Sequence, residues 1–244
     1  MTVLSVNLNK IALLRNSRGR DFPNVLEYAG RFIKAGAGGI TVHPRPDERH
    51  IKYDDARQLS EFLEQSDAIE LNIEGYPSDS FLQLIAETRP AQCTLVPDAA
   101  NQLTSDHGWD FHADMALVKD VVVQLQELGV RCSLFLDPDP GQVELAAETG
   151  AERIELYTEL YAEAFDTGVC EQVLAQYRES AELARSLGMG VNAGHDLDLQ
   201  NLPLFLTIPD ILEVSIGHAL TVECINNGMS AVMKKYLAIC HDSH

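Results

Sequence analysis

Residues 131–156 read RCSLFLDPDPGQVELAAETGAERIEL, and this stretch shows the structural unit from which the chain is built. A short apolar run at Arg131–Leu136 is followed by a helical pattern at Pro140–Glu148 and a second apolar run at Arg153–Leu156. Gly150 separates the helical pattern from the second run, and a residue that tolerates the left-handed conformation commonly ends a helix. The stretch therefore predicts a strand, a helix and a second strand.

The same alternation extends along the whole chain. The expected strands are Val3–Leu8, Gly39–His43, Ile69–Glu74, Gln92–Val96, Arg131–Leu136, Arg153–Leu156, Gly190–Ala193 and Ile211–Ile216. The expected helices are Asn24–Lys34, Asp54–Glu64, Asp79–Glu87, Ala113–Leu128, Pro140–Glu148, Val169–Leu187, Leu199–Thr207 and Leu220–Ala238. Eight strand–helix units in 244 residues predict an α/β fold, the (β/α)₈ TIM barrel, as one domain over residues 1–240 with a tail over 241–244.

The main alternative fold is a doubly wound open sheet. That fold usually carries a glycine-rich phosphate loop after an early strand, and neither GxGxxG nor GxxxxGK[ST] occurs here. One connection, Pro97–His112 after the fourth strand, is unusually long. A long loop at the C-terminal end of a barrel strand is often a mobile lid, and the alternative is a permanently ordered cover held in place by Trp109.

The composition excludes several classes of partner. Lys and Arg number 18 and Asp and Glu 37, a net charge of −19, which repels nucleic acid and anionic membrane surfaces. The apolar runs are too short to span a bilayer. The five cysteines are widely spaced and form no CxxC, so we expect free thiols and a cytoplasmic protein, without nucleic-acid or membrane partners.

Polar residues gather at the expected C-terminal ends of seven strands, the face where barrel active sites lie. They are Asn7, Asn9, Arg15, Arg18, His43, Arg45, His50, Asn72, Glu74, Thr104, Glu155, Thr158, Asn192, His195, Ser215, Gly217 and His218. Each alone has a purely structural explanation, since strand-end Asn and Thr commonly form turns. Together they combine proton-exchanging groups with donors for anions, which indicates an enzyme acting on small phosphorylated metabolites.

Metal binding is the main competing chemistry. His43, Asp47 and His50 are close in sequence, as are His107 and His112, and either group would suggest ligands. Neither HxH nor HExxH occurs, and metal-dependent barrel hydrolases usually carry one of these motifs. We therefore expect no metal and no other cofactor.

Several sequence blocks occur in a characteristic order. They are VNLNKIALLRNSRG, GITVHPRPDERHI, LNIEGYP, LVPD…LT, SLFLD, IELYTELYA, VNAGHDL and SIGHA. Together they resemble the pyridoxine 5′-phosphate synthase family over essentially the whole chain. The resemblance implies a (β/α)₈ barrel that condenses 3-amino-2-oxopropyl phosphate with 1-deoxy-D-xylulose 5-phosphate. The products would be pyridoxine 5′-phosphate, phosphate and water, with neither a redox cofactor nor an obligatory metal.

The resemblance also implies roles for individual residues. His43 matches a proton acceptor, Glu74 a general base, His195 a proton donor and Glu155 a residue that stabilises charge in the transition state. The matching contacts for the aminoketone phosphate are Asn7, Arg18, Asp196, Gly217 and His218. Those for the deoxyxylulose phosphate are Asn9, Lys10, Arg45, His50 and Thr104. The family further implies a homo-oligomer, an octamer built from dimers.

Two departures from the family pattern bear on substrate contact. The family often reads N-I-D-H where this chain has Asn7-Leu8-Asn9-Lys10, so an Asp–His pair is replaced by groups that do not titrate near neutral pH. Position 196 is Asp rather than the commoner Gly. If the N–H of Asp196 holds a phosphate, its carboxylate must turn away from that phosphate.

Two other functions remain open at this stage. The chain is then either another (β/α)₈ isomerase or lyase acting on small phosphorylated metabolites, or a non-enzymatic binding barrel. A lyase that forms a Schiff base requires a lysine at a strand end, and none of the expected strands ends in one. A binding barrel is expected to have lost at least one of His43, Glu74 and His195.

Overall fold

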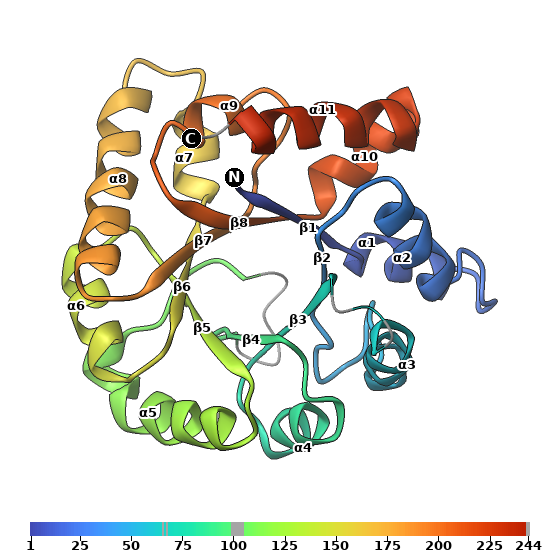
Figure 1. The fold of residues 1–244 in the computed structure, drawn as a ribbon, viewed down its shortest axis with the longest axis horizontal. Coiled ribbons are helices and arrows are strands. Elements are labelled where there is room, and N and C mark those ends of the chain that lie inside the picture. Colours follow the sequence, from blue (N-terminus) through green and yellow to red (C-terminus); the bar gives the residue numbers. More distant parts are fainter. Residues whose placement is uncertain (65, 67, 99–104, 243–244) are drawn as a thin grey trace.

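The chain folds into a closed barrel of eight parallel strands surrounded by helices (Figure 1). The computed structural model describes residues 1–64, 66, 68–98 and 105–242. The strands are β1 (Val3–Asn7), β2 (Gly39–Val42), β3 (Glu70–Gly75), β4 (Gln92–Leu95), β5 (Arg131–Leu136), β6 (Arg153–Tyr157), β7 (Gly190–His195) and β8 (Ile211–Ile216). Pairing of β1 with β8, with Ser5 opposite Ser215, closes the ring, so the expected TIM barrel is confirmed.

The helices form the outer layer (Figure 1). They are α1 (Asn9–Asn16), α2 (Val25–Lys34), α3 (Tyr53–Leu63), α4 (Asp79–Thr88), α5 (Phe111–Glu127), α6 (Pro140–Glu148), α7 (Glu159–Ala164), α8 (Cys170–Ser186), α9 (Leu202–Phe205), α10 (His218–Asn227) and α11 (Met229–Asp242). Within the part of the chain that the structure describes, no helix has the length and apolar character needed to cross a bilayer. All five cysteines are free thiols.

The β5–α6–β6 segment shows why the sequence folds in this way. Asp139 caps α6 by accepting a hydrogen bond from the Gly141 N–H at 2.8 Å, and Pro140 occupies the first turn, where its missing N–H costs nothing. Gly150 has a φ of +86° after the helix, a conformation that a residue with a β-carbon rarely adopts. The chain then enters β6, as expected.

Apolar side chains pack between strands and helices, whereas the barrel interior is largely polar. Hydrogen bonds cross the interior between strands that are not neighbours. Gln92 on β4 donates to Glu213 on β8 at 3.4 Å, and Thr94 on β4 donates to Glu155 on β6 at 3.2 Å. Because these side chains are buried and mutually bonded, the interior is a packed polar column that leads toward the strand C-termini.

The helices differ from expectation in four places. The short helices α1 and α7 were not expected, and each follows the end of a strand. The single helix expected over 220–238 is wrong, because Gly228 at φ +82° separates α10 from α11, and α11 extends into the expected tail. The helix expected over 199–207 is only the single turn α9.

The long loop after β4 is only partly described. Residues 99–104, and with them Thr104, lie outside the described residues, while α5 begins at Phe111 and shortens the expected loop by two residues. Trp109 is buried; its ring N–H donates to the Leu95 carbonyl at 2.8 Å, and its backbone N–H donates to the Phe135 carbonyl at 3.0 Å. The end of the loop is therefore fixed to β4 and β5, as the alternative of a permanently ordered cover requires. Movement of the rest of the loop remains a prediction.

Candidate active site

A cavity of about 540 Å³ lies at the C-terminal mouth of the barrel. Of the residues to which the family resemblance gives a role, all that the structure describes except Arg18 line this cavity, and Thr104 lies outside the described residues. The predicted residues in its wall are Asn7, Asn9, Lys10, His43, Arg45, His50, Glu74, Glu155, His195, Asp196, Gly217 and His218. The strand ends thus bring together side chains that are separated by more than two hundred residues of sequence.

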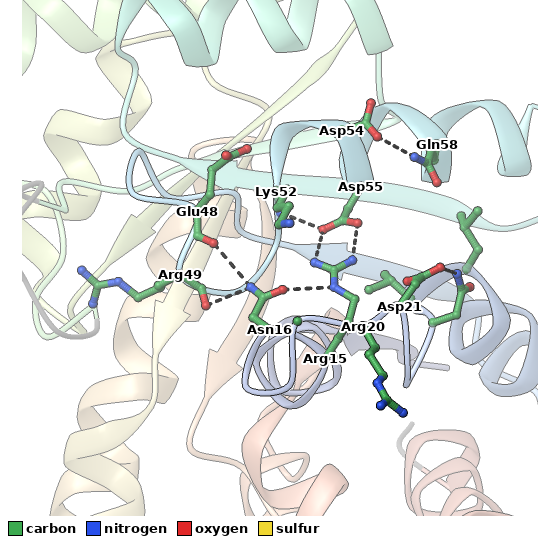
Figure 2. A pocket seen from close by; sticks show the side chains of 14 residues that line it. Arg15, Asn16, Arg20, Asp21, Glu48, Arg49, Lys52, Asp54, Asp55 and Gln58 are labelled. Atoms are coloured by element: carbon green, nitrogen blue, oxygen red, sulfur yellow. Dashed lines mark hydrogen bonds and ion pairs between the residues drawn. The ribbon is translucent and has the colours of Figure 1, made fainter.

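Arg18 does not join this group. It is exposed after the end of α1, and it is not among the residues that line the mouth. Beside it lies a separate hollow of about 600 Å³ between the α1–α2 segment and α3 (Figure 2). In that hollow Arg15 donates to Asp55, with 2.7 Å between Nη2 and Oδ2, so this arginine is used structurally.

His43 directly follows β2 and is buried at the centre of the mouth. Its Nδ1 lies 3.9 Å from Glu74 Oε2, and its Nε2 lies 3.9 Å from Asp98 Oδ2. Its backbone N–H donates to Asn9 Oδ1 at 3.0 Å, which ties the ends of β1 and β2 together. Burial, reinforced by the positive charge of Arg45, lowers the pKa of His43 well below its ordinary value. The imidazole is therefore neutral and able to accept a proton.

Two buried glutamates approach the mouth from β3 and β6. Burial, followed by repulsion from Glu155, raises the pKa of Glu74 well above that of a solvated carboxyl group. Burial raises the pKa of Glu155 to about 8, although the hydrogen bond from Thr94 opposes this effect. Both shifts favour the protonated carboxyl group, so each glutamate holds a proton at a higher pH than a solvated carboxyl group does.

Arg45 is held at the mouth by a carboxylate that the sequence analysis did not single out. Its Nη1 donates to Asp98 Oδ2 at 2.7 Å, and the Ser105 hydroxyl donates to the same oxygen at 2.8 Å. Both members of the ion pair are buried, and burial raises the pKa of Asp98. The motif LVPD contains Asp98, so its position was visible in the sequence, but its partner across the barrel was not.

His50 contributes a hydrogen-bond donor rather than a fixed positive charge. Burial, followed by the nearby Arg45, lowers its pKa to about 4. Its Nδ1 accepts a hydrogen bond from the Ile51 N–H at 2.9 Å, which places the ring proton of the neutral form on Nε2. The positive charge at this side of the mouth therefore comes from Arg45, Lys10 and Arg49, all in the cavity wall.

His195 and Asp196 form a close pair at the end of β7. His195 Nδ1 lies 2.6 Å from Asp196 Oδ2, and the Tyr157 ring meets the imidazole edge to face with 5.1 Å between centroids. The Asp196 backbone N–H donates to Thr158 Oγ1 at 3.2 Å. This N–H is already engaged, and the carboxylate turns toward His195, so the resting geometry does not present the N–H of Asp196 to a phosphate.

The seam between β1 and β8 forms the part of the wall next to the end of β7. Asn7 ends β1, and its side chain packs against Gly217, where a β-carbon would meet Asn7 Cβ at 3.0 Å. Gly217 precedes α10, and both Gly217 and His218 line the cavity. The first N–H groups of a helix are available donors for an anion, so this wall is suited to hold a phosphate.

The histidines considered as metal ligands do not gather around one point. His107 Nδ1 lies 2.5 Å from Asp106 Oδ1, and His112 belongs to the first turn of α5. The rings of His43 and His50 have centroids 6.3 Å apart. Among the residues that the structure describes, no three His, Cys, Asp or Glu side chains are grouped in a way that would hold a metal ion.

Comparison with known proteins identifies relatives over nearly the full length. A family model described as pyridoxal phosphate biosynthesis protein PdxJ matches residues 4–242. A pyridoxine 5′-phosphate synthase of Christiangramia forsetii is 51% identical over 240 residues, which are 98% of this chain and 99% of that protein. The enzyme of the same name from Flavobacterium johnsoniae is 48% identical over 97% of this chain and 98% of its own length.

Solved structures of low sequence identity share the barrel. Phosphoribosyl anthranilate isomerase from Thermotoga maritima superposes with a TM-score of 0.60 at 13% identity, covering 99% of each chain. A 3-hexulose-6-phosphate synthase superposes with a TM-score of 0.61 at 14% identity, covering 98% of this chain and 99% of that chain. At this identity the likeness concerns the fold alone.

Proposed function

Because the chain belongs to the PdxJ family of pyridoxal phosphate biosynthesis proteins, its activity is that of a pyridoxine 5′-phosphate synthase, and we propose that the barrel mouth is where the reaction occurs. The reaction condenses 3-amino-2-oxopropyl phosphate with 1-deoxy-D-xylulose 5-phosphate to give pyridoxine 5′-phosphate, phosphate and water. It joins an amine to a ketone, expels water and phosphate, and closes an aromatic ring. All of these steps move protons.

The observation that carries the proposal is the set of proton-exchanging groups in different states around one cavity. His43 is neutral because burial lowers its pKa, and Glu155 holds a proton at neutral pH because burial raises its pKa to about 8. Groups whose environments separate their protonation states can act as acid and base at a single pH. A protein that only binds its ligand does not require proton-exchanging groups in different protonation states.

We propose that Glu74 is the base for attack by the amine. The aminoketone must lose a proton from nitrogen before that nitrogen can bond to the ketone carbon, and an ionised Glu74 carboxylate accepts it. Glu155, protonated beside it, donates a hydrogen bond to negative charge that develops on oxygen. The raised pKa of Glu74 makes it a stronger base than a solvated carboxylate once it is ionised.

The histidines serve the later steps in this proposal. Neutral His43 accepts a carbon-bound proton as the ring closes or phosphate leaves, because both of its ring nitrogens lie near carboxyl oxygens that can stabilise the resulting imidazolium. His195 donates a proton to a departing hydroxyl group, which leaves as water. The assignment of these steps to the two histidines is part of the proposal.

Donors in two neighbouring parts of the cavity wall support the binding of two phosphorylated substrates. Arg45, Lys10 and the neutral His50 lie on one side, where we place the deoxyxylulose phosphate together with Asn9. Asn7, Gly217 and His218 lie at the β1–β8 seam, where we place the aminoketone phosphate. The assignments of Arg18 and Thr104 rest on the family resemblance, and Arg18 would have to change position relative to the mouth to contact a phosphate bound there.

The test is an assay for phosphate release with both substrates and with each one alone. The proposed function requires turnover only when both are present, together with formation of pyridoxine 5′-phosphate. Turnover of one phosphorylated substrate alone would favour the isomerase or lyase alternative. Binding without turnover would favour a binding barrel.

We further propose that the protein acts as a cytoplasmic homo-oligomer, an octamer built from dimers. Apolar side chains exposed on neighbouring helices support self-association, because Leu14 on α1 is 48% exposed and Ile225 on α10 is 72% exposed. Light scattering during size-exclusion chromatography tests this assembly. A monomer at the concentration used for the activity assay would contradict it.

A further inference from the structure

The end of β7 holds a carboxylate against the imidazole proposed as the proton donor. His195 Nδ1 and Asp196 Oδ2 are 2.6 Å apart, which is a short charge-assisted hydrogen bond. His195 has a φ of +99°, outside the regions that non-glycine residues usually occupy. A residue kept in such a conformation is held there by its surroundings.

The backbone around this pair is fixed by two polar side chains. The Thr158 hydroxyl donates to the Gly194 carbonyl at 2.8 Å and accepts from the Asp196 N–H at 3.2 Å. The Asn201 amide donates to the Asp196 carbonyl at 3.1 Å. Since both backbone groups of Asp196 are engaged, its side chain has a defined direction, and that direction leads to His195.

The imidazole is also oriented from its other side. The Tyr157 ring meets it at an interplanar angle of 84°, and the Tyr157 hydroxyl donates to Glu159 Oε2 at 2.6 Å. The ring therefore lies between an aromatic edge-to-face contact and a carboxylate. This arrangement sets both the plane of the ring and the nitrogen that faces away from Asp196.

We propose that Asp196 is a positioning residue for His195, and that its carboxylate keeps a hydrogen on Nδ1 so that Nε2 is the nitrogen that passes a proton to the substrate. In the donating state both ring nitrogens carry hydrogen. The Nε2–H proton moves to the departing hydroxyl oxygen, the carbon–oxygen bond breaks and water leaves. His195 is then neutral with its remaining hydrogen on Nδ1, still bonded to Asp196. This inference rests on the proposed function of the mouth.

A direct contact between Asp196 and substrate is the competing explanation, since a carboxylate also attracts the ammonium group of the aminoketone. The two explanations differ in kinetics. Loss of a positioning residue lowers kcat and leaves the KM of each substrate near its original value, whereas loss of a substrate contact raises one KM.

The experiment compares Asp196→Ala and Asp196→Asn with Asp166→Asn as a control. Asp166 lines the adjoining pocket on the same side of the mouth, is exposed, and offers the same loss of charge without touching His195. We expect both Asp196 variants to lose about tenfold or more in kcat, with KM unchanged within about twofold. The control should keep the original kcat and KM, and thermal unfolding shows whether each variant is folded.

A second readout does not depend on activity. In protein with ¹⁵N-labelled histidine, the ring signals of neutral His195, assigned by their loss in His195→Asn, should show hydrogen on Nδ1. In Asp196→Ala they should shift toward the form with hydrogen on Nε2, and in Asp166→Asn they should not. Unchanged ring signals in Asp196→Ala, or a raised KM with unchanged kcat, would overturn the proposal. Absence of turnover by the unaltered enzyme would instead overturn the proposed function, and the ring signals would still decide the pairing.

Discussion

The backbone of Gly194 lies directly against the carboxyl group of Glu155, since a β-carbon at position 194 would stand 2.2 Å from Glu155 Oε1. No side chain fits at this separation unless the glutamate moves. The position of a proposed active-site carboxyl group on β6 is thus set by the absence of a side chain on β7.

We therefore expect Gly194→Ala to displace Glu155 and to lower kcat by about ten- to a hundredfold, because misplaced catalytic groups lose most of their effect. Gly168→Ala is the matched control, since a β-carbon there meets nothing within 4 Å and its φ is not positive. Steady-state assays of the two variants make the comparison. Equal activities would show that the close contact has no functional importance.

Replacement of Glu74 tests the proposed base. Glu74→Gln keeps the size of the buried side chain and removes its ability to accept a proton, so kcat should fall by about 10²–10⁴. Thermal unfolding should remain cooperative. The exposed Glu144 provides the control variant Glu144→Gln, and a Glu74→Gln enzyme as active as this control would contradict the assignment.

The stability of the protein should depend on the ionisation of Glu155. Burial raises its pKa from 4.5 to about 8, so between these pH values the folded chain holds a proton that the unfolded chain has lost. The stability that accompanies the protonated form is complete below pH 4.5 and is lost as the pH rises through 8. At about 1.36 kcal/mol per pH unit, this loss amounts to at most about 5 kcal/mol.

Glu155→Gln removes this titration. Between pH 5 and pH 8, the free energy of unfolding of the unaltered protein should therefore fall relative to that of the variant. Urea denaturation at several pH values measures the difference. A difference that does not change with pH would show that Glu155 ionises in the folded protein much as it does in the unfolded chain.

Variants of the buried pair of Arg45 and Asp98 distinguish an effect on protein stability from an effect on substrate affinity. Arg45→Ala leaves the Asp98 carboxyl group buried without its guanidinium partner, which should cost about 3–5 kcal/mol of unfolding free energy. Adding Asp98→Ala should restore part of that stability, because the uncompensated carboxyl group is then gone. Both variants should raise the KM of deoxyxylulose phosphate by about ten- to a hundredfold, since a charged hydrogen bond contributes about 1.5–3 kcal/mol. Recovery of KM in the double variant would exclude Arg45 as a phosphate contact.

The barrel was predictable from the sequence because its determinants are local. The eight apolar runs coincide with the eight strands, and Gly150 ends its helix as expected. Two helices were missed because they are short and begin within polar strand-end segments. Gly228 was included in a continuous helix because the apolar pattern continues on both sides of it. The break is visible only in the structure, where Gly228 has a positive φ.

The site was predictable to the extent that strand ends converge. A strand-end residue can be assigned to the mouth from topology alone, and His43, Glu74, Glu155 and His195 follow this rule. Contacts between loops do not follow it. The bond between Arg45 and Asp98 joins segments after β2 and β4, and no sequence period relates them. The position of Arg18 away from the mouth was not predictable for a similar reason, because Arg18 follows the helix α1, which was not expected from the sequence.

The seam between β1 and β8 has a consequence for synthesis of the protein. Asn7 from the first strand and Gly217 after the last one build a wall of the same cavity. A ribosome extends the chain from the N-terminus, so β1 cannot pair with β8 until nearly the entire polypeptide has been synthesised. We therefore expect a chain that ends before β8 to lack this wall of the cavity and to have no synthase activity.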